Sequence, residues 1–331
     1  ASGYANTASG AYASALGHLN RACCTSSVSV GYNNTSSHCY SQVFGNSNTS
    51  SGLNSTAIGF CNIAATLNSV VMGRSNFTGT GIAAVSIGIL NNQTGGTYTA
   101  GTGVIGSVPA AANAGCSSTA VGVKNTSSGV CSASFGYCNV ASGGGSTAVG
   151  SLNTADCFLS NAVGSCHTIS NARGTAVGIS NTVSGTFGLA VGCANTVSGS
   201  YAFALGSSNS ALSTNSITIG RHNFSGAVSA LSFGLLNNSA GTGAIDLTFG
   251  SITGTPTAVT PGILSTSLGV CNCSTGLTSM AVGVLNKATA TSAVAIGYGN
   301  TASAAFASAF GHNLTNNVAT STKMGPADNA S

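Results

Sequence analysis

Twelve cysteines are the most reactive side chains in this chain of 331 residues, and two pairs of them share one spacing. Cys24 and Cys39 are separated by one residue more than the repeat period described below, and so are Cys116 and Cys131. In stacked repeats, this spacing would bring the two Cα atoms of each pair within disulfide range. The sequence therefore offers these two pairs as candidate disulfides. Most of the twelve cysteines are expected to be small, buried or half-buried apolar residues.

Other groups that could do chemistry are few and scattered. The three carboxylates, Asp156, Asp246 and Asp328, lie far apart in the sequence, so a catalytic pair of acids is not expected. The five histidines are scattered among several phases of different coils, and no C-x-x-C motif occurs. We therefore expect no catalytic residue, no metal site and no cofactor.

Charge and hydropathy exclude further classes of function. Charged residues make up 3% of the chain and the formal net charge is +4, so attraction to nucleic acid or to anionic lipid is weak. The mean hydropathy is +0.35, yet apolar residues occur singly or in pairs. The run of about 18 apolar residues that a membrane-spanning helix needs is missing. We expect no nucleic-acid partner and no membrane span.

A glycine recurs at every fourteenth position along most of the chain, from Gly3 to Gly325. The residue before it is large and apolar and the residue two before it is small, as in Ala15-Leu16-Gly17. Such alternation is typical of a strand, because successive side chains point to opposite faces. The large residues form an expected apolar stripe that includes Leu16, Val30, Phe44, Ile58, Val121, Phe135, Val149, Val177, Val191, Ile219, Val282 and Ile296.

Asparagine usually stands three residues after the repeat glycine. Asparagine tolerates left-handed backbone and bonds its own backbone in turns, so we expect it to mark a corner. Identical asparagines on stacked coils could also form a side-chain ladder. The expected turn asparagines include Asn20, Asn34, Asn48, Asn62, Asn125, Asn139, Asn181, Asn195, Asn223, Asn286 and Asn300.

Each repeat therefore predicts a strand, a Gly-Asn turn, a second strand and a Ser-Gly turn. Such a unit is one coil of an all-β, parallel β-roll or β-solenoid, with neighbouring coils about 4.8 Å apart. Counting every repeat glycine, Gly106 and Gly250 included, gives about 23 coils. One large apolar side chain per coil is little burial for a lone chain, so we expect association with sister chains. We favour small residues inside the roll and large ones at the chain-to-chain interface, although alternation alone also allows the reverse.

The irregular spacings recur after about 147 residues, which indicates a longer internal repeat. Gly73-Arg-Ser-Asn-Phe-Thr-Gly79 is echoed by Gly220-Arg-His-Asn-Phe-Ser-Gly226. We expect one elongated domain over residues 1–331, a fragment of a longer fibre, with superunits at roughly 17–163 and 164–310. Irregular loops are expected near 92–104 and 253–263, and loops on a rigid scaffold commonly carry binding.

The phrases Ser118-Thr-Ala-Val-Gly122, Ser146-Thr-Ala-Val-Gly150 and Asn195-Thr-Val-Ser-Gly199 resemble the head repeats of YadA-like trimeric autotransporter adhesins. The resemblance implies a left-handed β-roll, a homotrimer around one axis, and an extracellular role in attachment at a cell surface, without catalysis. The partners that we expect are sister chains and a surface receptor, which is a protein or a glycan.

Three other functions are compatible with a solenoid. A virion-surface fibre or spike shaft of a virus or phage would use the same roll, and twelve cysteines are unusual for an autotransporter passenger. An ice-binding solenoid needs threonine at one position of successive coils, but three before the glycine the chain has Ser14, Val28 and Gln42. A carbohydrate-cleaving solenoid would need more acidic residues than the chain has. We favour the adhesive, structural fibre.

Overall fold

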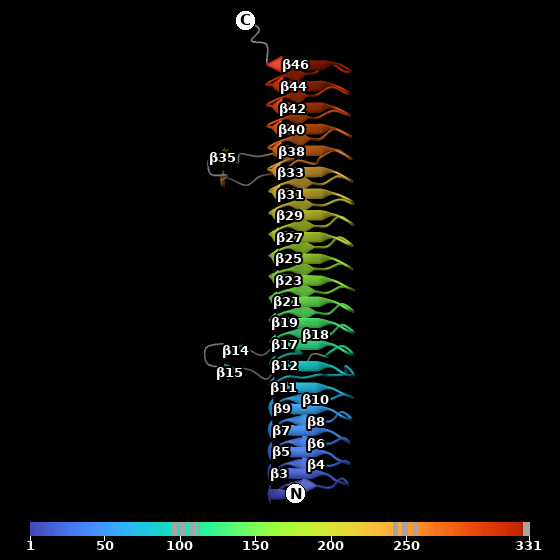
Figure 1. Cartoon of the computed structure of the whole chain (residues 1–331), viewed down its shortest axis with the longest axis vertical. Coiled ribbons are helices and arrows are strands. Elements are labelled where there is room, and N and C mark those ends of the chain that lie inside the picture. The colour runs from blue at the N-terminus through green and yellow to red at the C-terminus, as the bar shows by residue number, and fades with distance from the viewer. Residues whose placement is uncertain are drawn as a thin grey trace. The chain divides into compact units, whose positions relative to one another are not determined.

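The computed structural model shows an all-β chain. It describes residues 1–94, 98–99, 104–105, 110–111, 113–240, 244–246, 251–253 and 257–326. The chain forms two compact units, Ala1–Ser170 (unit 1) and Asn171–Ser331 (unit 2). In each unit the chain winds through successive turns that stack in sequence order (Figure 1). Among the described residues, no helix is long and apolar enough to cross a membrane.

The described part of unit 1 contains two series of parallel strands, one long and one short. The long strands are β1 (Ser2–Tyr4), β3 (Ser14–His18), β5 (Val28–Tyr32), β7 (Gln42–Asn46), β9 (Thr56–Phe60), β11 (Val70–Arg74), β12 (Val85–Ile89), β17 (Thr119–Val123), β19 (Ala133–Tyr137), β21 (Thr147–Ser151) and β23 (Asn161–Ser165). The two-residue strands are β2 (Thr7–Ala8), β4 (Arg21–Ala22), β6 (Thr35–Ser36), β8 (Thr49–Ser50), β10 (Ile63–Ala64), β18 (Thr126–Ser127), β20 (Val140–Ala141), β22 (Thr154–Ala155) and β24 (Thr168–Ile169).

The described part of unit 2 repeats this arrangement. Its long strands are β25 (Thr175–Ile179), β27 (Leu189–Cys193), β29 (Phe203–Ser207), β31 (Ile217–Arg221), β33 (Leu231–Leu235), β38 (Thr266–Val270), β40 (Met280–Val284), β42 (Val294–Tyr298), β44 (Ser308–His312) and β46 (Thr322–Pro326). Its two-residue strands are β26 (Thr182–Val183), β28 (Thr196–Val197), β30 (Ser210–Ala211), β32 (Phe224–Ser225), β39 (Cys273–Ser274), β41 (Lys287–Ala288), β43 (Thr301–Ala302) and β45 (Thr315–Asn316).

The register of the long strands explains the period of the glycines. Gly17 on β3 lies opposite Gly31 on β5, and Leu16 lies opposite Val30, so one repeat makes one turn. Gly17 has a φ of 114°, and a Cβ at this position would overlap the carbonyl oxygen of Gly31. Because L side chains rarely adopt such a φ and the next turn leaves no room for a Cβ, glycine is required here.

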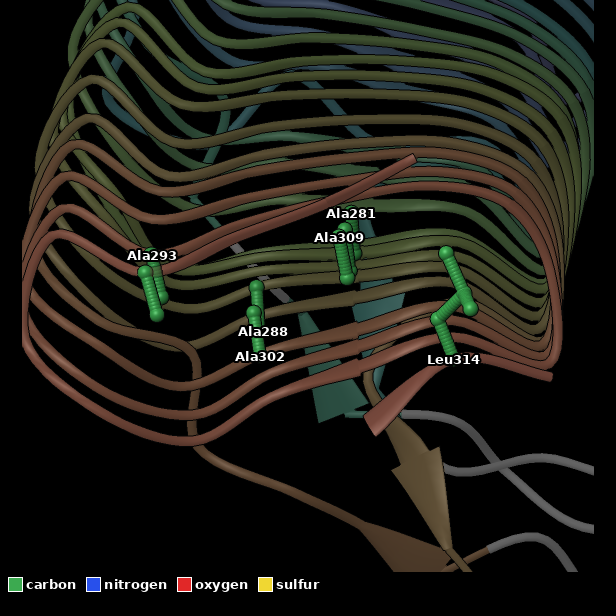
Figure 2. Close-up of a cluster of buried hydrophobic side chains, with 8 residues drawn as sticks. Ala281, Ala288, Ala293, Ala302, Ala309 and Leu314 are labelled. Carbon is green, nitrogen blue, oxygen red and sulfur yellow. The ribbon is translucent and has the colours of Figure 1, made fainter. Parts of the chain in front are cut away.

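Small side chains line the interior of each turn. In unit 2, Ala281, Ala293 and Ala309 are fully buried in one cluster, with Leu314 at its edge (Figure 2). Among the described residues, the residue two before most repeat glycines points inward, as Ala15 does in unit 1, whereas Ala1 and Lys323 are exposed. Of the two arrangements that alternation allows, the structure has the small residues inside and the large ones on the outer face.

The expected number of 23 coils is wrong. β12 pairs directly with β17, which puts Gly88 opposite Gly122, and β33 pairs directly with β38, which puts Gly234 opposite Gly269. The described residues therefore give eleven long strands in unit 1 and ten in unit 2, or about twenty turns. Gly106 and Gly250 lie outside the described residues, in insertions that the strand ladder bypasses.

Antiparallel strand pairs occur in these two insertions. In unit 1, β13 (Gln93–Thr94) pairs with β16 (Ala110–Ala111) and β14 (Tyr98–Thr99) pairs with β15 (Val104–Ile105). In unit 2, β34 (Ser239–Ala240) pairs with β37 (Thr257–Ala258) and β35 (Ala244–Asp246) pairs with β36 (Ser251–Thr253). The second insertion therefore begins well before the expected loop at 253–263, because the direct pairing of β33 with β38 leaves this whole segment out of the stack.

Candidate interaction surface

The large apolar residues before the repeat glycines lie on the outer face of the long strands. None of the twelve predicted stripe residues is buried. Leu16, Phe135 and Val177 are exposed, and the other nine are half-buried by their neighbours in the stripe. Leu16 has 45% of its surface exposed, and the interior of this turn is filled by its neighbour Ala15. The stripe is therefore a surface feature and not a core.

A second apolar column widens this surface in unit 2. Three residues before the glycine, the side chains also point outward, and from β27 to β33 they are all large and apolar. Strand register places them in rows beside the stripe. We name this surface the apolar patch, and it consists of Leu189, Val191, Phe203, Leu205, Ile217, Ile219, Leu231 and Phe233. Leu205 is exposed and the other seven side chains are half-buried. Contiguous apolar surface that is open to solvent in this way marks an interaction site.

The short strands present the opposite chemistry on their outer face. The first residue of each short strand is exposed or half-buried, and in most turns it is threonine or serine. Threonines stand here at Thr7, Thr35, Thr49, Thr126, Thr154, Thr168, Thr182, Thr196, Thr301 and Thr315. This threonine column was not predicted, because it stands one residue after the ladder asparagine and not three residues before the glycine. Most turns thus have one apolar and one hydroxyl-rich outer face, and covering the apolar face removes unfavourable contact between apolar side chains and water.

The asparagines expected at corners are buried and form a ladder. All eleven have at most 1% of their surface exposed. The left-handed residue of the corner is the one before the asparagine, for example Leu19, with a φ of 57°, and Asn33, with a φ of 53°. The expectation that the asparagine itself takes left-handed backbone is therefore wrong, because its side chain is needed inside the turn.

Asn34 shows the hydrogen bonds that each rung of the ladder makes. Its Nδ2 donates to the carbonyl oxygen of Val30 at 3.0 Å, to that of Gly45 at 2.6 Å and to Oδ1 of Asn20 at 3.0 Å. Its Oδ1 accepts a bond from the backbone N–H of Asn48 at 3.0 Å. One amide therefore joins three successive turns and leaves no polar group of its own unsatisfied.

Within the described part of the ladder, two positions carry other residues. His167 is fully buried there, its backbone N–H donates to Asn153 Oδ1, and its Nε2 lies 3.1 Å from the carbonyl oxygen of Val163. Leu314 keeps only the backbone bond, from its N–H to Asn300 Oδ1. Both side chains fill the site that an asparagine fills elsewhere, so they have a structural place and do not form a ligand site.

The two candidate cysteine pairs differ. Cys24 and Cys39 are joined by a disulfide, with their Cα atoms 4.8 Å apart. Cys116 and Cys131 are both exposed free thiols. Burial raises the pKa of the Cys271 and Cys273 thiols, and it also raises that of Cys61 against the opposing charge of Arg74.

Titratable side chains do not gather into a site in the described part of the chain. No group of three or more histidine, cysteine or acidic residues there could hold a metal ion. Asp156 accepts a hydrogen bond from Ser142, whereas the side chains of Asp246 and Asp328 lie outside what the structure describes. Burial, and then the charge of Arg221, lowers the pKa of His222.

Stacked rings that were not predicted lie directly after several repeat glycines. Tyr4 stacks on His18 with ring centroids 5.0 Å apart, and His18 stacks on Tyr32 at 5.1 Å. Tyr298 and His312 repeat this contact in unit 2. The signal was present in the sequence, since aromatic residues follow the glycine in successive repeats. The stacked rings cover one another's faces, which stabilises neighbouring turns.

Comparison with known families supports the repeat assignment. Residues 43–60, 50–75, 274–300 and 288–313 match the family model of the YadA head domain repeat. These ranges fall in unit 1 and in unit 2. YadA head repeats belong to adhesins and are not catalytic, and YadA-like adhesins are homotrimers displayed on the bacterial cell surface. No curated protein sequence matches the chain significantly.

Proposed function

We propose, because this chain carries YadA head domain repeats, that it forms part of the head of a homotrimeric surface adhesin and catalyses no reaction. The observation that carries the proposal is the exposed apolar face of the long strands, which continues from turn to turn in each unit. In the proposed assembly this face packs against two sister chains, and the turns wind left-handedly as in the family.

The energetics of the apolar patch favour such packing. Fully burying one valine, leucine, isoleucine or phenylalanine side chain stabilises a protein by about 1.5–3 kcal/mol. The patch offers eight of these side chains on four strands, and the stripe continues on the other long strands. Since no charged residue lies within the patch, a second copy of the same face can cover it without leaving a charge unpaired. Self-association along the repeats follows from the chemistry of the surface.

The mass of the protein in solution tests the assembly. We expect the intact protein to have about three times the chain mass of 31.7 kDa by light scattering after gel filtration. Introducing Leu205→Lys with Ile219→Lys places charges in the patch, so this variant should dissociate to a smaller species. The matched control, Thr196→Lys with Ser210→Lys, places the same charges on the hydroxyl-rich face and should keep the trimer mass. A single-chain mass for the unmodified protein would contradict the proposal.

Attachment is tested with the same pair of variants. Cells that display the head on their surface should adhere to host cells or matrix, and the patch variant should lose this adhesion because multivalent presentation is lost. The control variant should retain it. The receptor, whether protein or glycan, is then the component whose removal from the target surface abolishes adhesion. Equal adhesion of cells with and without the head would count against an adhesive role.

Ice binding is a second candidate that one observation favours. Thr182 lies opposite Thr196, and Thr301 lies opposite Thr315, so the short strands present pairs of threonines at the spacing of a parallel ladder. The threonine column is interrupted, for example at Lys287, which leaves no long uniform array among the described strands. We therefore place this function second. Thermal hysteresis at micromolar protein, lost on replacing the paired threonines, would favour it over adhesion.

A further inference from the structure

We propose that Cys116 and Cys131 form a second disulfide between successive turns, at the base of the insertion in unit 1. Both thiols are exposed and free, and the backbone N–H of Cys131 donates to the carbonyl oxygen of Cys116 at 2.8 Å. This hydrogen bond places the two residues on adjacent turns in direct backbone contact. A disulfide requires Cα atoms about 4.4–6.8 Å apart, a range that such neighbours satisfy.

The bonded pair in the same unit shows that this diagonal placement accommodates a disulfide. Cys24 opens the tight turn that ends at Ser27, and Cys39 is the second residue of the turn from His38 to Ser41. Their sequence separation of 15 places them on successive turns, one position out of register, with Cα atoms 4.8 Å apart.

Cys116 and Cys131 repeat this relation one step further along the turn. Cys116 is the second residue of the turn from Gly115 to Ser118, and Cys131 is the third residue of the turn from Gly129 to Ser132. Their separation in the sequence equals that of the bonded pair, so they also stand one position out of register on successive turns.

The location gives the proposed bond a role. Cys116 lies in the first turn after the insertion, where the chain rejoins the stack between β12 and β17. In unit 2 the equivalent place, just after the second insertion, has a buried Pro261 before Gly262. Proline restricts the unfolded chain, and a disulfide does the same by closing a loop. The two units would thus restrict the returning chain by different means.

The reaction is the oxidation of two thiols by a low-molecular-weight disulfide such as oxidised glutathione. The Cys116 and Cys131 sulfurs form one S–S bond and lose two protons and two electrons, and the S–S bond of the oxidant is reduced to two thiols. The proposal rests on the proposed function only for the oxidising surroundings of a surface protein, which the added oxidant replaces in the test.

Mass mapping without reduction tests the bond directly. Trypsin cleaves after Arg74, Lys124 and Arg173, so Cys116 is the one cysteine of peptide 75–124 and Cys131 lies in peptide 125–173. After oxidation with glutathione disulfide and alkylation of free thiols, we expect these two peptides to remain linked. Thiol titration should fall from ten free cysteines to eight. Cys116 and Cys131 both carrying the alkyl label, while the bond between Cys24 and Cys39 persists, would overturn the proposal.

The matched control is the Cys131→Ser variant. It removes one thiol yet should show nine free cysteines after the same oxidation, because Cys116 loses its partner. Persistent linkage of peptides 75–124 and 125–173 in this variant would assign the bond to another cysteine and overturn the proposal, as would linkage between chains. The Leu205→Lys, Ile219→Lys variant should form the same bond, so a failure of the trimer proposal leaves this result unchanged.

Discussion

At the residue scale, the buried asparagine ladder is the feature that binds one turn to the next. Asn195 Nδ2 donates to the carbonyl oxygens of Val191 at 3.1 Å and Gly206 at 2.9 Å, and Oδ1 accepts the backbone N–H of Asn209 at 3.0 Å. Removing the amide would leave two carbonyls and one N–H without these partners inside the turn. Each unsatisfied buried group costs about 1–3 kcal/mol, so the ladder contributes more than its small apolar area suggests.

We therefore expect Asn195→Ala to lower the free energy of unfolding by about 2 kcal/mol or more, within the usual range for orphaned buried groups. Asn317→Ala is the control, because Asn317 is an exposed asparagine of the same unit and does not have left-handed backbone. Urea unfolding followed by circular dichroism measures both. Equal stability of the two variants would show that the ladder amides contribute little.

The sequence predicted the positions of the ladder asparagines. The left-handed backbone of the corner, however, belongs to the residue before each asparagine and not to the asparagine itself. Asn33 and Asn34 are adjacent and chemically identical, yet only Asn33 has left-handed backbone and only Asn34 is buried. In other repeats the left-handed position holds leucine, alanine or cysteine, residues that give no turn signal. The distinction depends on which side chain reaches the carbonyls of the next turn, and this is a property of stacked turns and not of local propensity.

At the element scale, a large side chain at one interior position of a turn is matched by a small residue at the interior position that faces it. Ser41 and Ser36 pack against each other inside unit 1. In unit 2, Val183 and Val197 occupy the place equivalent to Ser36, and the place equivalent to Ser41 between them is Gly188. A Cβ on Gly188 would lie 3.0 Å from Val183 Cγ1 and 2.9 Å from Val197 Cγ1. Large and small residues therefore compensate across the turn, as close packing requires.

Gly188→Ala should consequently destabilise the protein, although many other repeats carry serine or alanine there. Overpacking of this kind costs about 1–3 kcal/mol. Adding Val197→Ala should recover most of the loss, because it recreates the surroundings of Ala202, which has Val197 in its own turn and the small Ala211 in the next. Thermal unfolding of the single and double variants measures the coupling. A single variant as stable as the parent would contradict this packing account.

At the scale of the whole molecule, the period and alternation predicted the parallel strands and their outward apolar stripe, because both follow from geometry that every repeat shares. The number of turns could not be predicted in the same way. Gly106 and Gly250 follow apolar residues like true repeat glycines, but only strand pairing reveals that Gly88 stands opposite Gly122 and Gly234 opposite Gly269. A local phrase therefore identifies a turn only when its neighbours continue the register.

The bypassed insertion leads to a prediction for the entire chain. Deleting residues 93–112, between Gly88 and Gly122, restores the regular repeat spacing without touching the paired strands β12 and β17. We expect the deleted protein to keep its strand signal in circular dichroism and its mass in solution, because the stack on either side is already hydrogen-bonded. A matched deletion of residues 126–139 removes a whole repeat and should behave similarly, since it removes one rung and rejoins the same phase. Deleting residues 126–132 instead shifts the phase by half a turn and should disrupt folding. If the 93–112 deletion unfolded like the half-turn deletion, the insertion would have to be counted as part of the solenoid.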